Sequence, residues 1–308
     1  MVSVKNVGER ELIRKLIDTL RSSPFPGSTD DATIIDDIVL CSDITSFDRH
    51  MSKGMNYREF GWMAAAVNFS DIASMGAEPI GILAAASIPE DLDEEAFMDI
   101  MRGMDECAKI CNAFIVGGDT KFGQGMVAGT AVGRLNGRMP LMRSGASPGD
   151  MIAVTGPLGS AAAGYFALEN DMNGIPLTSL RTPTPRTSEG MMLSSSGAVT
   201  SCMDLSDGLA EGAKGICSAS NVGMDIHMEF LPEGDGVEKV SKSLGMDRKD
   251  LMLYWGGDYE LLFTFKKDRM DRLYEYDVDF SIIGKVTDGN LPYILENNEG
   301  MVMKNGRY

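Results

Sequence analysis

Apolar side chains follow two spacings along this chain, and the alternation of these spacings predicts strands separated by helices. Apolar residues three and four positions apart predict helices at residues 9–20, 57–75, 93–111, 159–170 and, after a turn, within 204–220. Short apolar runs bounded by turn residues predict strands at residues 37–44, 81–88, 113–120, 126–135, 151–156 and 256–265. A glycine turn is expected to close the strand at 113–120 and to precede the strand at 256–265. Strands alternating with helices in both halves predict two α/β or α+β domains of similar size.

The boundary between these domains is expected at residues 144–150, SGASPGD, where glycine, serine and proline cluster. The predicted domains are residues 1–146 and 147–308. A chain of 308 residues has the usual length of two domains. It contains no repeat of fixed period, which excludes a solenoid.

The charge of the chain restricts its partners. With 28 Lys and Arg against 45 Asp and Glu, the net charge of −17 disfavours nucleic acid and anionic membranes as partners. A protein this acidic can act on an anionic substrate only if basic residues or metal ions supply positive charge at the site. The N-terminus has no apolar secretory core, and no apolar run is long enough to span a membrane. The five cysteines include no CxxC pair, which favours reduced thiols in the cytoplasm.

One predicted helix places a carboxylate where its charge is unfavourable. Asp71 continues the apolar stripe formed by Phe60, Met63, Ala64 and Val67. It also falls in the last turn of the helix, where the helix dipole is negative. Without a partner, such a carboxyl would stay protonated or destabilise the fold. A cation facing Asp71 would remove this conflict.

Further acidic and hydroxyl side chains stand where predicted elements begin or end. They are Asp30 and Asp31 in a turn, Ser42 and Asp43 at the end of a strand, Asp119 after a glycine pair, and Asp204, Ser206 and Asp207 before a helix. Taken singly, each fits an ordinary turn or helix-capping role. Taken together, they form the oxygen-rich set that hard divalent cations require, and Mg²⁺ combines carboxylates with water and phosphate oxygens.

The usual nucleotide-binding and nucleophile motifs are missing. The chain has no GxxxxGK[ST], no GxGxxG before a helix, no protein-kinase motifs and no GxSxG. Its only histidines, His50 and His227, cannot form a His-rich zinc site. We therefore assign no residue as a covalent catalyst. Many metal ligands without a nucleophile favour phosphoryl transfer, in which positioning and charge neutralisation supply most of the rate.

Eight segments in order resemble the thiamine-monophosphate kinase family. They are DDATII, SDITSFDRH, VNFSDIASMGAEPIG, VGGDT, RSGASPGD, VTGPLGSAAAG, DLSDGL and GGDYELLFT. The resemblance runs from about Asp30 to Thr264, most of the chain. This family belongs to a superfamily of ATP-binding enzymes that includes aminoimidazole ribonucleotide synthetase, selenophosphate synthetase and a hydrogenase-maturation factor.

The resemblance implies a two-domain fold like that of aminoimidazole ribonucleotide synthetase, with mixed sheets flanked by helices and a homodimer formed through the N-terminal sheets. It implies transfer of phosphate from ATP to thiamine monophosphate, giving thiamine diphosphate, with several Mg²⁺ ions. The positions matching metal ligands are Asp31, Ser42, Asp43, Asp71, Asp119, Asp204 and Asp207. Those matching ATP contacts are Gly118, Asp119, Arg143 and Ser206. Those matching substrate contacts are His50, Asp258, Glu260 and Tyr308.

The chain departs from the family pattern in two of these segments. Thr29 replaces the first residue of Gly-Asp-Asp, and the family's Gly-Gly-Glu-Asp-Tyr-Glu is one acid short here, so Asp258 and Glu260 both remain candidates for the substrate contact. Another enzyme of the superfamily and a non-catalytic nucleotide-binding protein are the alternatives. A selenophosphate synthetase would need a reactive cysteine in a mobile N-terminal segment, whereas Cys41 falls in a predicted strand. A hydrogenase-maturation factor would end in a cysteine-containing tail, whereas Tyr308 ends this chain. An aminoimidazole ribonucleotide synthetase stays open.

Overall fold

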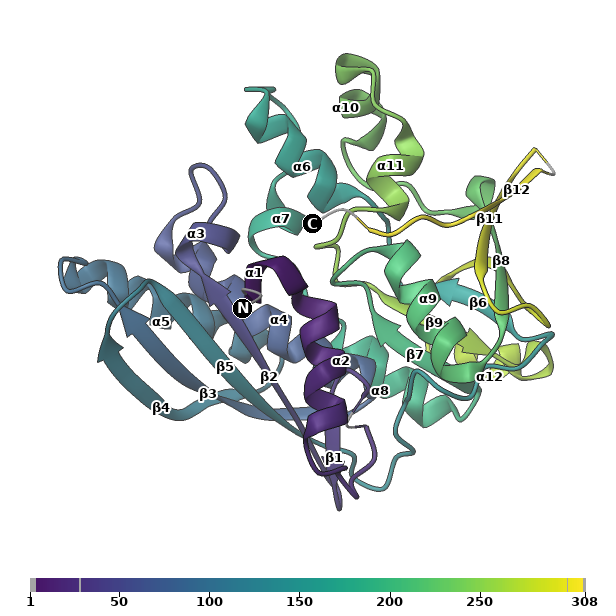
Figure 1. Ribbon diagram of the computed structural model, residues 1–308, viewed down its shortest axis with the longest axis horizontal. Coiled ribbons are helices and arrows are strands. Elements are labelled where there is room, and N and C mark those ends of the chain that lie inside the picture. The colour runs from purple at the N-terminus through teal and green to yellow at the C-terminus, as the bar shows by residue number, and fades with distance from the viewer. Residues whose placement is uncertain (1–3, 28, 298, 307–308) are drawn as a thin grey trace.

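The computed structural model describes residues 4–27, 29–297 and 299–306, and its strands form two sheets that lie side by side, each covered by helices (Figure 1). The first sheet has five strands in the order β1-β2-β5-β3-β4. Their bounds are β1 (Thr33–Ile35), β2 (Ile38–Ser46), β3 (Glu78–Ile88), β4 (Phe114–Phe122) and β5 (Met126–Arg134). Only β3 and β4 run parallel to each other in this sheet. It is therefore a mixed sheet.

Two long helices, α4 (Tyr57–Ser74) and α5 (Glu94–Ile110), cover one face of this sheet. A capping box fixes the start of α4, because the Asn56 side chain accepts from Glu59 N and the Glu59 side chain accepts from Asn56 N. The two helices approach so closely that a Cβ at Gly61 would lie 1.9 Å from the carbonyl oxygen of Ile100, so only glycine fits there. Phe60, Phe69 and Ile72 of α4 are fully buried in the core beneath the sheet. The other face of the sheet carries exposed apolar side chains, which include Ile80, Leu83 and Ile44.

The second sheet has seven strands in the order β12-β11-β8-β10-β6-β9-β7. Their bounds are β6 (Met151–Val154), β7 (Val199–Asp204), β8 (Gly223–His227), β9 (Leu261–Phe265), β10 (Ser281–Thr287), β11 (Pro292–Glu296) and β12 (Glu299–Val302). The helices of this half are α6 (Ser160–Glu169), α7 (Thr178–Arg181), α8 (Thr187–Ser196), α9 (Leu209–Ser220), α10 (Val237–Leu244), α11 (Arg248–Leu253) and α12 (Met270–Glu275). All five residues of β9 are buried, which places this strand at the centre of the second core.

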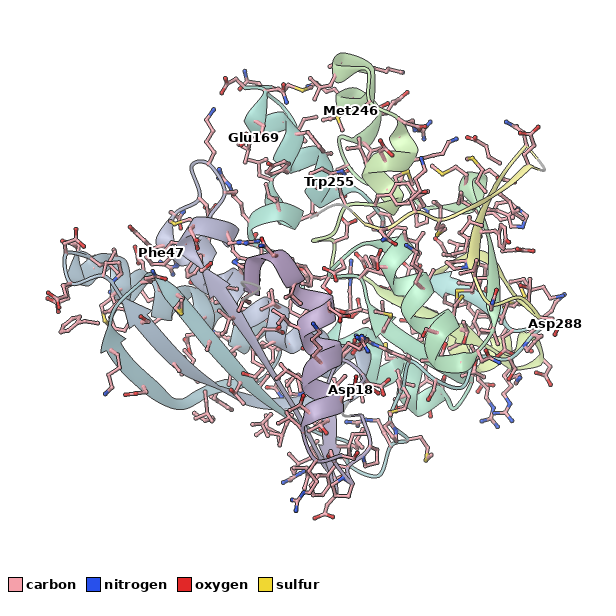
Figure 2. The ribbon with its side chains drawn as sticks, viewed as in Figure 1. Asp18, Phe47, Glu169, Met246, Trp255 and Asp288 are labelled. Atoms are coloured by element: carbon pink, nitrogen blue, oxygen red, sulfur yellow. The ribbon has the colours of Figure 1, made fainter. Side chains whose placement is uncertain are left out.

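The remaining helices belong to the N-terminal part of the chain. The short helix α3 (Phe47–His50) follows β2, and the N-terminal helices α1 (Val4–Val7) and α2 (Glu9–Thr19) lie across the front of the molecule between the domains (Figure 1). Side chains fill much of the space between the ribbons, with Phe47 on the first domain and Trp255 beside α6 on the second (Figure 2). Among the helices of the described ranges, none is both long enough and apolar enough to cross a membrane.

The predicted fold class is confirmed, since both halves combine a mixed sheet with covering helices. One local prediction was wrong. The glycine pair Gly117–Gly118 does not end the strand, because β4 continues to Phe122. Gly118 has φ 156°, and a Cβ there would lie 1.8 Å from the carbonyl oxygen of Ala84. Position 118 needs glycine because the backbone of β3 passes close to it, and not because the chain turns there.

Candidate active site

Three carboxylates, one buried and two half-buried, meet where the two domains face each other. Asp31, Asp71 and Asp204 each contribute one carboxylate oxygen to a group whose members lie within 4.8 Å of one another. Asp31 lies in the turn before β1, Asp71 in the last turn of α4 and Asp204 at the end of β7. The group therefore combines two acids of the first domain with one of the second, and we call it the acidic cluster.

Hydrogen bonds fix the position of these carboxylates. Arg143 binds Asp31 through Nε at 2.9 Å and also through Nη2, and its backbone N–H donates to Asp30 Oδ1 at 2.6 Å. The backbone N–H of Asp204 donates to Asp31 Oδ2 at 3.3 Å. Ser70 Oγ donates to Asp204 Oδ2 at 2.7 Å. The side chain of Asp31 is 2% exposed, so Arg143 is paired with a carboxylate that water hardly reaches.

The close approach of these acids changes their protonation. Burial raises the pKa of Asp71 well above its usual range, and the neighbouring charges of Asp204 and Asp43 raise it further. Burial, followed by repulsion from Asp31, raises the pKa of Asp204 to about 8. In the absence of cations, the carboxyls of Asp71 and Asp204 hold protons at neutral pH. A divalent cation would replace the protons, which is the condition that made Asp71 acceptable on an apolar helix face.

Asp43 lies close enough to the acidic cluster for its negative charge to raise the pKa of Asp71. Its backbone N–H donates to Asn68 Oδ1 at 3.1 Å, and Asn68 Nδ2 donates to Ala64 O at 3.0 Å. Asn68, a residue of α4, therefore ties this helix to β2. The sequence reading missed both Asn68 and Ser70, although a polar residue on the buried face of an apolar helix is a signal that could have found them.

Two predicted metal ligands lie on the opposite face of the first sheet. Successive side chains of a strand point to opposite faces, so Ser42 points away from Asp43. Ser42 Oγ donates to Gly129 O at 2.8 Å and lies 3.0 Å from Thr130 Oγ1. Only the backbone of Ser42 is therefore available to a cation near Asp43.

Asp119, predicted for both metal and ATP, pairs in the sheet with the exposed residue Ala85. Its carboxylate accepts from Thr120 N at 2.9 Å and lies 3.4 Å from Lys121 Nζ. Within the described residues of one chain, the structure does not bring Asp119 or its neighbour Gly118 to the acidic cluster.

A cavity of about 910 Å³ adjoins the acidic cluster. Its walls are α1–α2, Arg143, the turn after β7 and the first half of α9. The lining residues are Val7, Gly8, Glu11, Ile13, Arg143, Met203, Asp204, Ser206, Asp207, Glu211, Gly212, Lys214 and Gly215. Cavities of this size hold drug-sized ligands and cofactors. Arg143 and Ser206, both predicted to contact ATP, thus share one cavity with Asp204 and Asp207.

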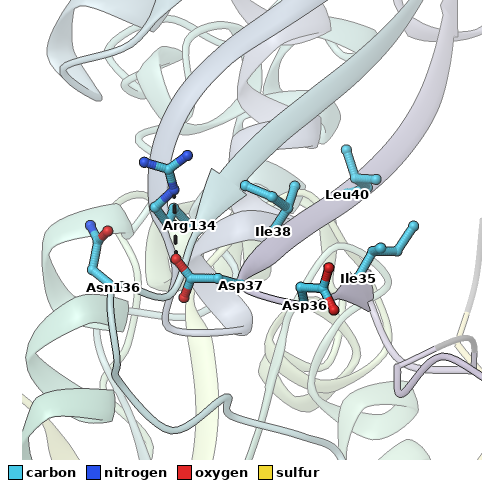
Figure 3. A pocket seen from close by; sticks show the side chains of 7 residues that line it. All are labelled: Ile35, Asp36, Asp37, Ile38, Leu40, Arg134 and Asn136. Atoms are coloured by element: carbon cyan, nitrogen blue, oxygen red, sulfur yellow. Dashed lines mark ion pairs between the residues drawn. The ribbon is translucent and has the colours of Figure 1, made fainter.

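A second hollow, of about 510 Å³, lies at the turn between β1 and β2 (Figure 3). Asp37 and Arg134 form an ion pair of 3.6 Å across it, and Asp36 and Asn136 lie at its sides. None of the residues lining it belongs to the acidic cluster. The larger cavity is therefore the candidate site.

His50, predicted to contact substrate, is exposed at the end of α3. Its Nδ1 accepts from Ser46 N at 3.0 Å, so in the neutral ring Nε2 carries the proton and is a donor. The loop that follows is held against the second domain, because Arg181 Nη2 donates to Lys53 O at 2.8 Å and Lys53 Nζ donates to Asp171 at 2.7 Å.

The two alternative substrate acids are both bound within the second domain. Asp258 accepts from the backbone N–H of Gly159 at 2.6 Å and of Ala161 at 3.0 Å, so it caps α6. Glu260 accepts from Arg186 Nε and from Thr155 Oγ1, each at 2.7 Å. The sequence gives no local sign of Arg186, which lies 74 positions before Glu260. Tyr308 lies outside the described residues.

Comparison with known proteins agrees with this architecture. The family model of the AIR synthase related protein N-terminal domain matches residues 29–135, and the model of the C-terminal domain matches residues 147–295. The chain is therefore an AIR synthase-related protein. The thiamine-monophosphate kinase of Methanopyrus kandleri is 32% identical over 295 residues, which cover 94% of this chain and 93% of that protein. The chain belongs to the thiamine-monophosphate kinase family, as the order of its motifs predicted.

Solved structures give the same result. The thiamine monophosphate kinase of Aquifex aeolicus has a TM-score of 0.86 at 25% identity, covering 97% of this chain and 99% of that chain. AaThiL, solved in complex with AMPPCP and TMP, has the same TM-score and identity over 99% of each chain. A HypE–HypF complex has a TM-score of 0.82 at 22% identity, over 96% of this chain and 99% of that chain. At this lower identity, the likeness to HypE shows a common fold alone.

Proposed function

We propose that this protein transfers the terminal phosphate of ATP to thiamine monophosphate, giving thiamine diphosphate and ADP. The observation that carries the proposal is the acidic cluster, in which oxygens of Asp31, Asp71 and Asp204 from both domains lie within 4.8 Å beside a cavity of about 910 Å³. Membership of the thiamine-monophosphate kinase family supports ATP as the donor and thiamine monophosphate as the acceptor.

The donor set fits Mg²⁺, since carboxylate oxygens are the ligands that this ion prefers. We assign the cation site to the acidic cluster together with Asp43 and Asp207. Because these acids exceed what one Mg²⁺ uses, we propose several ions, which when bound would neutralise charge on ATP and on the carboxylates. The raised pKa of Asp204 supports this assignment, because a buried acid that repels its neighbours is stabilised by a cation.

The side chains of the site have distinct roles in this proposal. Arg143 orients the ATP phosphates, because its guanidinium lines the cavity and is held in place by Asp31. Ser206 contacts ATP from the turn after β7. The acceptor is a phosphate that is already ionised at neutral pH, so no general base is needed. His50 offers its Nε2–H to an acceptor oxygen of thiamine monophosphate.

We also propose a homodimer that buries the outer face of the first sheet. Ile44 is 61% exposed and Leu83 is 41% exposed on this face, and exposed apolar side chains gathered on one face of a sheet are typical of protein interfaces. Asp119 and Ser42 lie on the same face, so an interface there would give both residues a new environment. We further propose the division into residues 1–146 and 147–308, and location in the cytoplasm, which the five buried free cysteines favour.

The test is to mix purified protein with ATP, Mg²⁺ and thiamine monophosphate, and to follow ADP and thiamine diphosphate together by chromatography. Equal formation of both products, abolished by EDTA, is the expected result. Asp43→Asn should lose this activity at ordinary Mg²⁺ concentration, and full activity would contradict its metal role. A parallel reaction with the formylglycinamidine substrate of aminoimidazole ribonucleotide synthetase tests the alternative enzyme. AMPPCP binding without turnover of either acceptor would favour a non-catalytic protein.

A further inference from the structure

Tyr259 has a backbone conformation that a bulky residue rarely adopts. Its φ is +52°, in the left-handed region, and it lies between Asp258 and Glu260. Such strained residues persist only where the surrounding structure holds them, and they concentrate at functional sites. Glycine or asparagine would occupy this position at lower cost, so the tyrosine side chain requires an explanation.

The neighbours of Tyr259 hold its backbone in place. Asp258 is bound to the N-terminus of α6, and Glu260 is bound to Arg186 and Thr155. The backbone N–H of Tyr259 donates to Leu205 O at 3.4 Å. These anchors all belong to the second domain. The Tyr259 side chain nevertheless packs against the core of the first domain, so it crosses from one domain to the other.

The crossing places the phenol among carboxylates of both domains. The charged groups that act on it are Asp204, Asp43, Asp71 and Asp207. A phenol is protonated and neutral at ordinary pH, and the bond from Tyr259 N to Leu205 O starts its side chain beside Asp204, which precedes Leu205 in the chain. The phenol is therefore an O–H donor in a region rich in acceptors, and it adds no negative charge to a site that must accept phosphate.

We propose that the Tyr259 hydroxyl donates a hydrogen bond to an oxygen of the terminal phosphate of ATP, the group that is transferred. This inference rests on the proposed function. The hydroxyl approaches from the second domain, next to the turn that carries Ser206 and Asp207, because Gly257 N donates to Ser206 O at 2.9 Å. The strained backbone is then the cost of directing a donor into the acidic cluster from residues anchored elsewhere.

The experiment compares AMPPCP, which has a terminal phosphate, with ADP, which lacks it. Binding of each in the presence of Mg²⁺ is measured by calorimetry for the wild type and for Tyr259→Phe, which keeps the ring and removes only the hydroxyl. We expect about tenfold weaker AMPPCP binding, the effect of one hydrogen bond to a charged group, and unchanged ADP binding. The kcat for thiamine diphosphate formation should fall about tenfold or more. Tyr254→Phe, a buried tyrosine of the same segment, should change none of these values.

Equal AMPPCP affinity in wild type and Tyr259→Phe would overturn the inference. Equal weakening of AMPPCP and ADP would also overturn it, since the hydroxyl would then shape the site rather than contact the terminal phosphate. Tyr259→Asn, which suits the left-handed backbone, serves if the first variant fails to fold, and it should show the same selective loss of AMPPCP binding. A wild type that makes no thiamine diphosphate would refute the proposed function alone, because the comparison of AMPPCP with ADP needs no acceptor.

Discussion

Replacing Asp204 with asparagine should stabilise the cation-free protein and weaken its response to Mg²⁺. Asparagine keeps an oxygen that can accept from Ser70 Oγ but carries no charge. The wild-type carboxyl is 3% exposed, and its pKa is raised to about 8 by burial and by Asp31. Folding at neutral pH without cations must therefore protonate Asp204, whereas the variant needs no proton.

The magnitude follows from the two pKa values. The folded pKa of about 8 lies above the ordinary value of 3.8, so the native state binds one more proton than the unfolded chain between these pH values. The free energy of unfolding therefore falls as pH rises from about 4 to about 8, and it is level above that range. Each pH unit costs about 1.36 kcal/mol, so the difference between variant and wild type reaches at most about 4 kcal/mol at pH 7. It is at most about 2 kcal/mol at pH 5.

The assay is thermal unfolding at pH 5, 7 and 8, in EDTA and in Mg²⁺. In EDTA, the Tm of Asp204→Asn should exceed that of the wild type by a margin that grows with pH, at about 2–4 °C for each kcal/mol. Adding Mg²⁺ should raise the Tm of the wild type more than that of the variant, because the wild type retains the Asp204 carboxylate as a metal ligand. Asp288→Asn, in an exposed turn (Figure 2), is the matched control and should show no such trend. A variant that is no more stable than wild type in EDTA at pH 8 would refute the reasoning.

Substitutions at three further positions separate a contact to ATP from structural contacts. Arg143→Ala should raise the KM for ATP at least about tenfold in steady-state assays, and unchanged kinetics would remove Arg143 from the site. Arg143→Lys should restore ATP affinity only in part, because a lysine cannot bind a phosphate in a bidentate manner. Asp258→Ala should lower the free energy of unfolding by about 1–2 kcal/mol in urea titrations, since it removes the cap of α6, and unchanged stability would contradict the capping role. Gly118→Ala should lower the free energy of unfolding by about 2 kcal/mol or more, because the added Cβ would collide with the backbone of β3. Gly289→Ala, whose Cβ would make only ordinary contacts, should leave the free energy of unfolding nearly unchanged.

The parts of the fold that follow from local pattern were predictable from the sequence. The apolar spacing around Asp71 predicts α4 almost to the residue, because that helix is apolar on its buried face and begins at a strong cap. The same spacing identified the Asp71 charge as unfavourable, and the structure places that charge beside Asp31 and Asp204. Local pattern thus identified one member of the acidic cluster as well as the helix.

The parts that depend on distant contacts were not predictable in this way. Gly118 resembles a turn glycine, and only the position of β3 shows that it sits in a strand. The strand period could have shown that Ser42 and Asp43 face opposite sides, although family motifs group them together. Asp258 and Glu260, the two candidates for the substrate contact, are already bound by partners of the second domain, which no local pattern reveals.

The position of the acidic cluster connects stability with function. Each domain has its own core, but burial and the nearby charge of Asp31 disfavour the Asp204 carboxylate where the domains meet in the cation-free state. The protein accepts this cost in the cation-free state because fixed, mutually repelling oxygens bind a divalent ion without having to reorganise. With the proposed Mg²⁺ ions bound, the same arrangement would let a chain of net charge −17 accept two phosphate-bearing substrates, since the ions held by the carboxylates would meet their charge. Replacing Asp71 or Asp204 with a neutral residue should therefore give a more stable cation-free protein that has lost part of its means to bring two anions together.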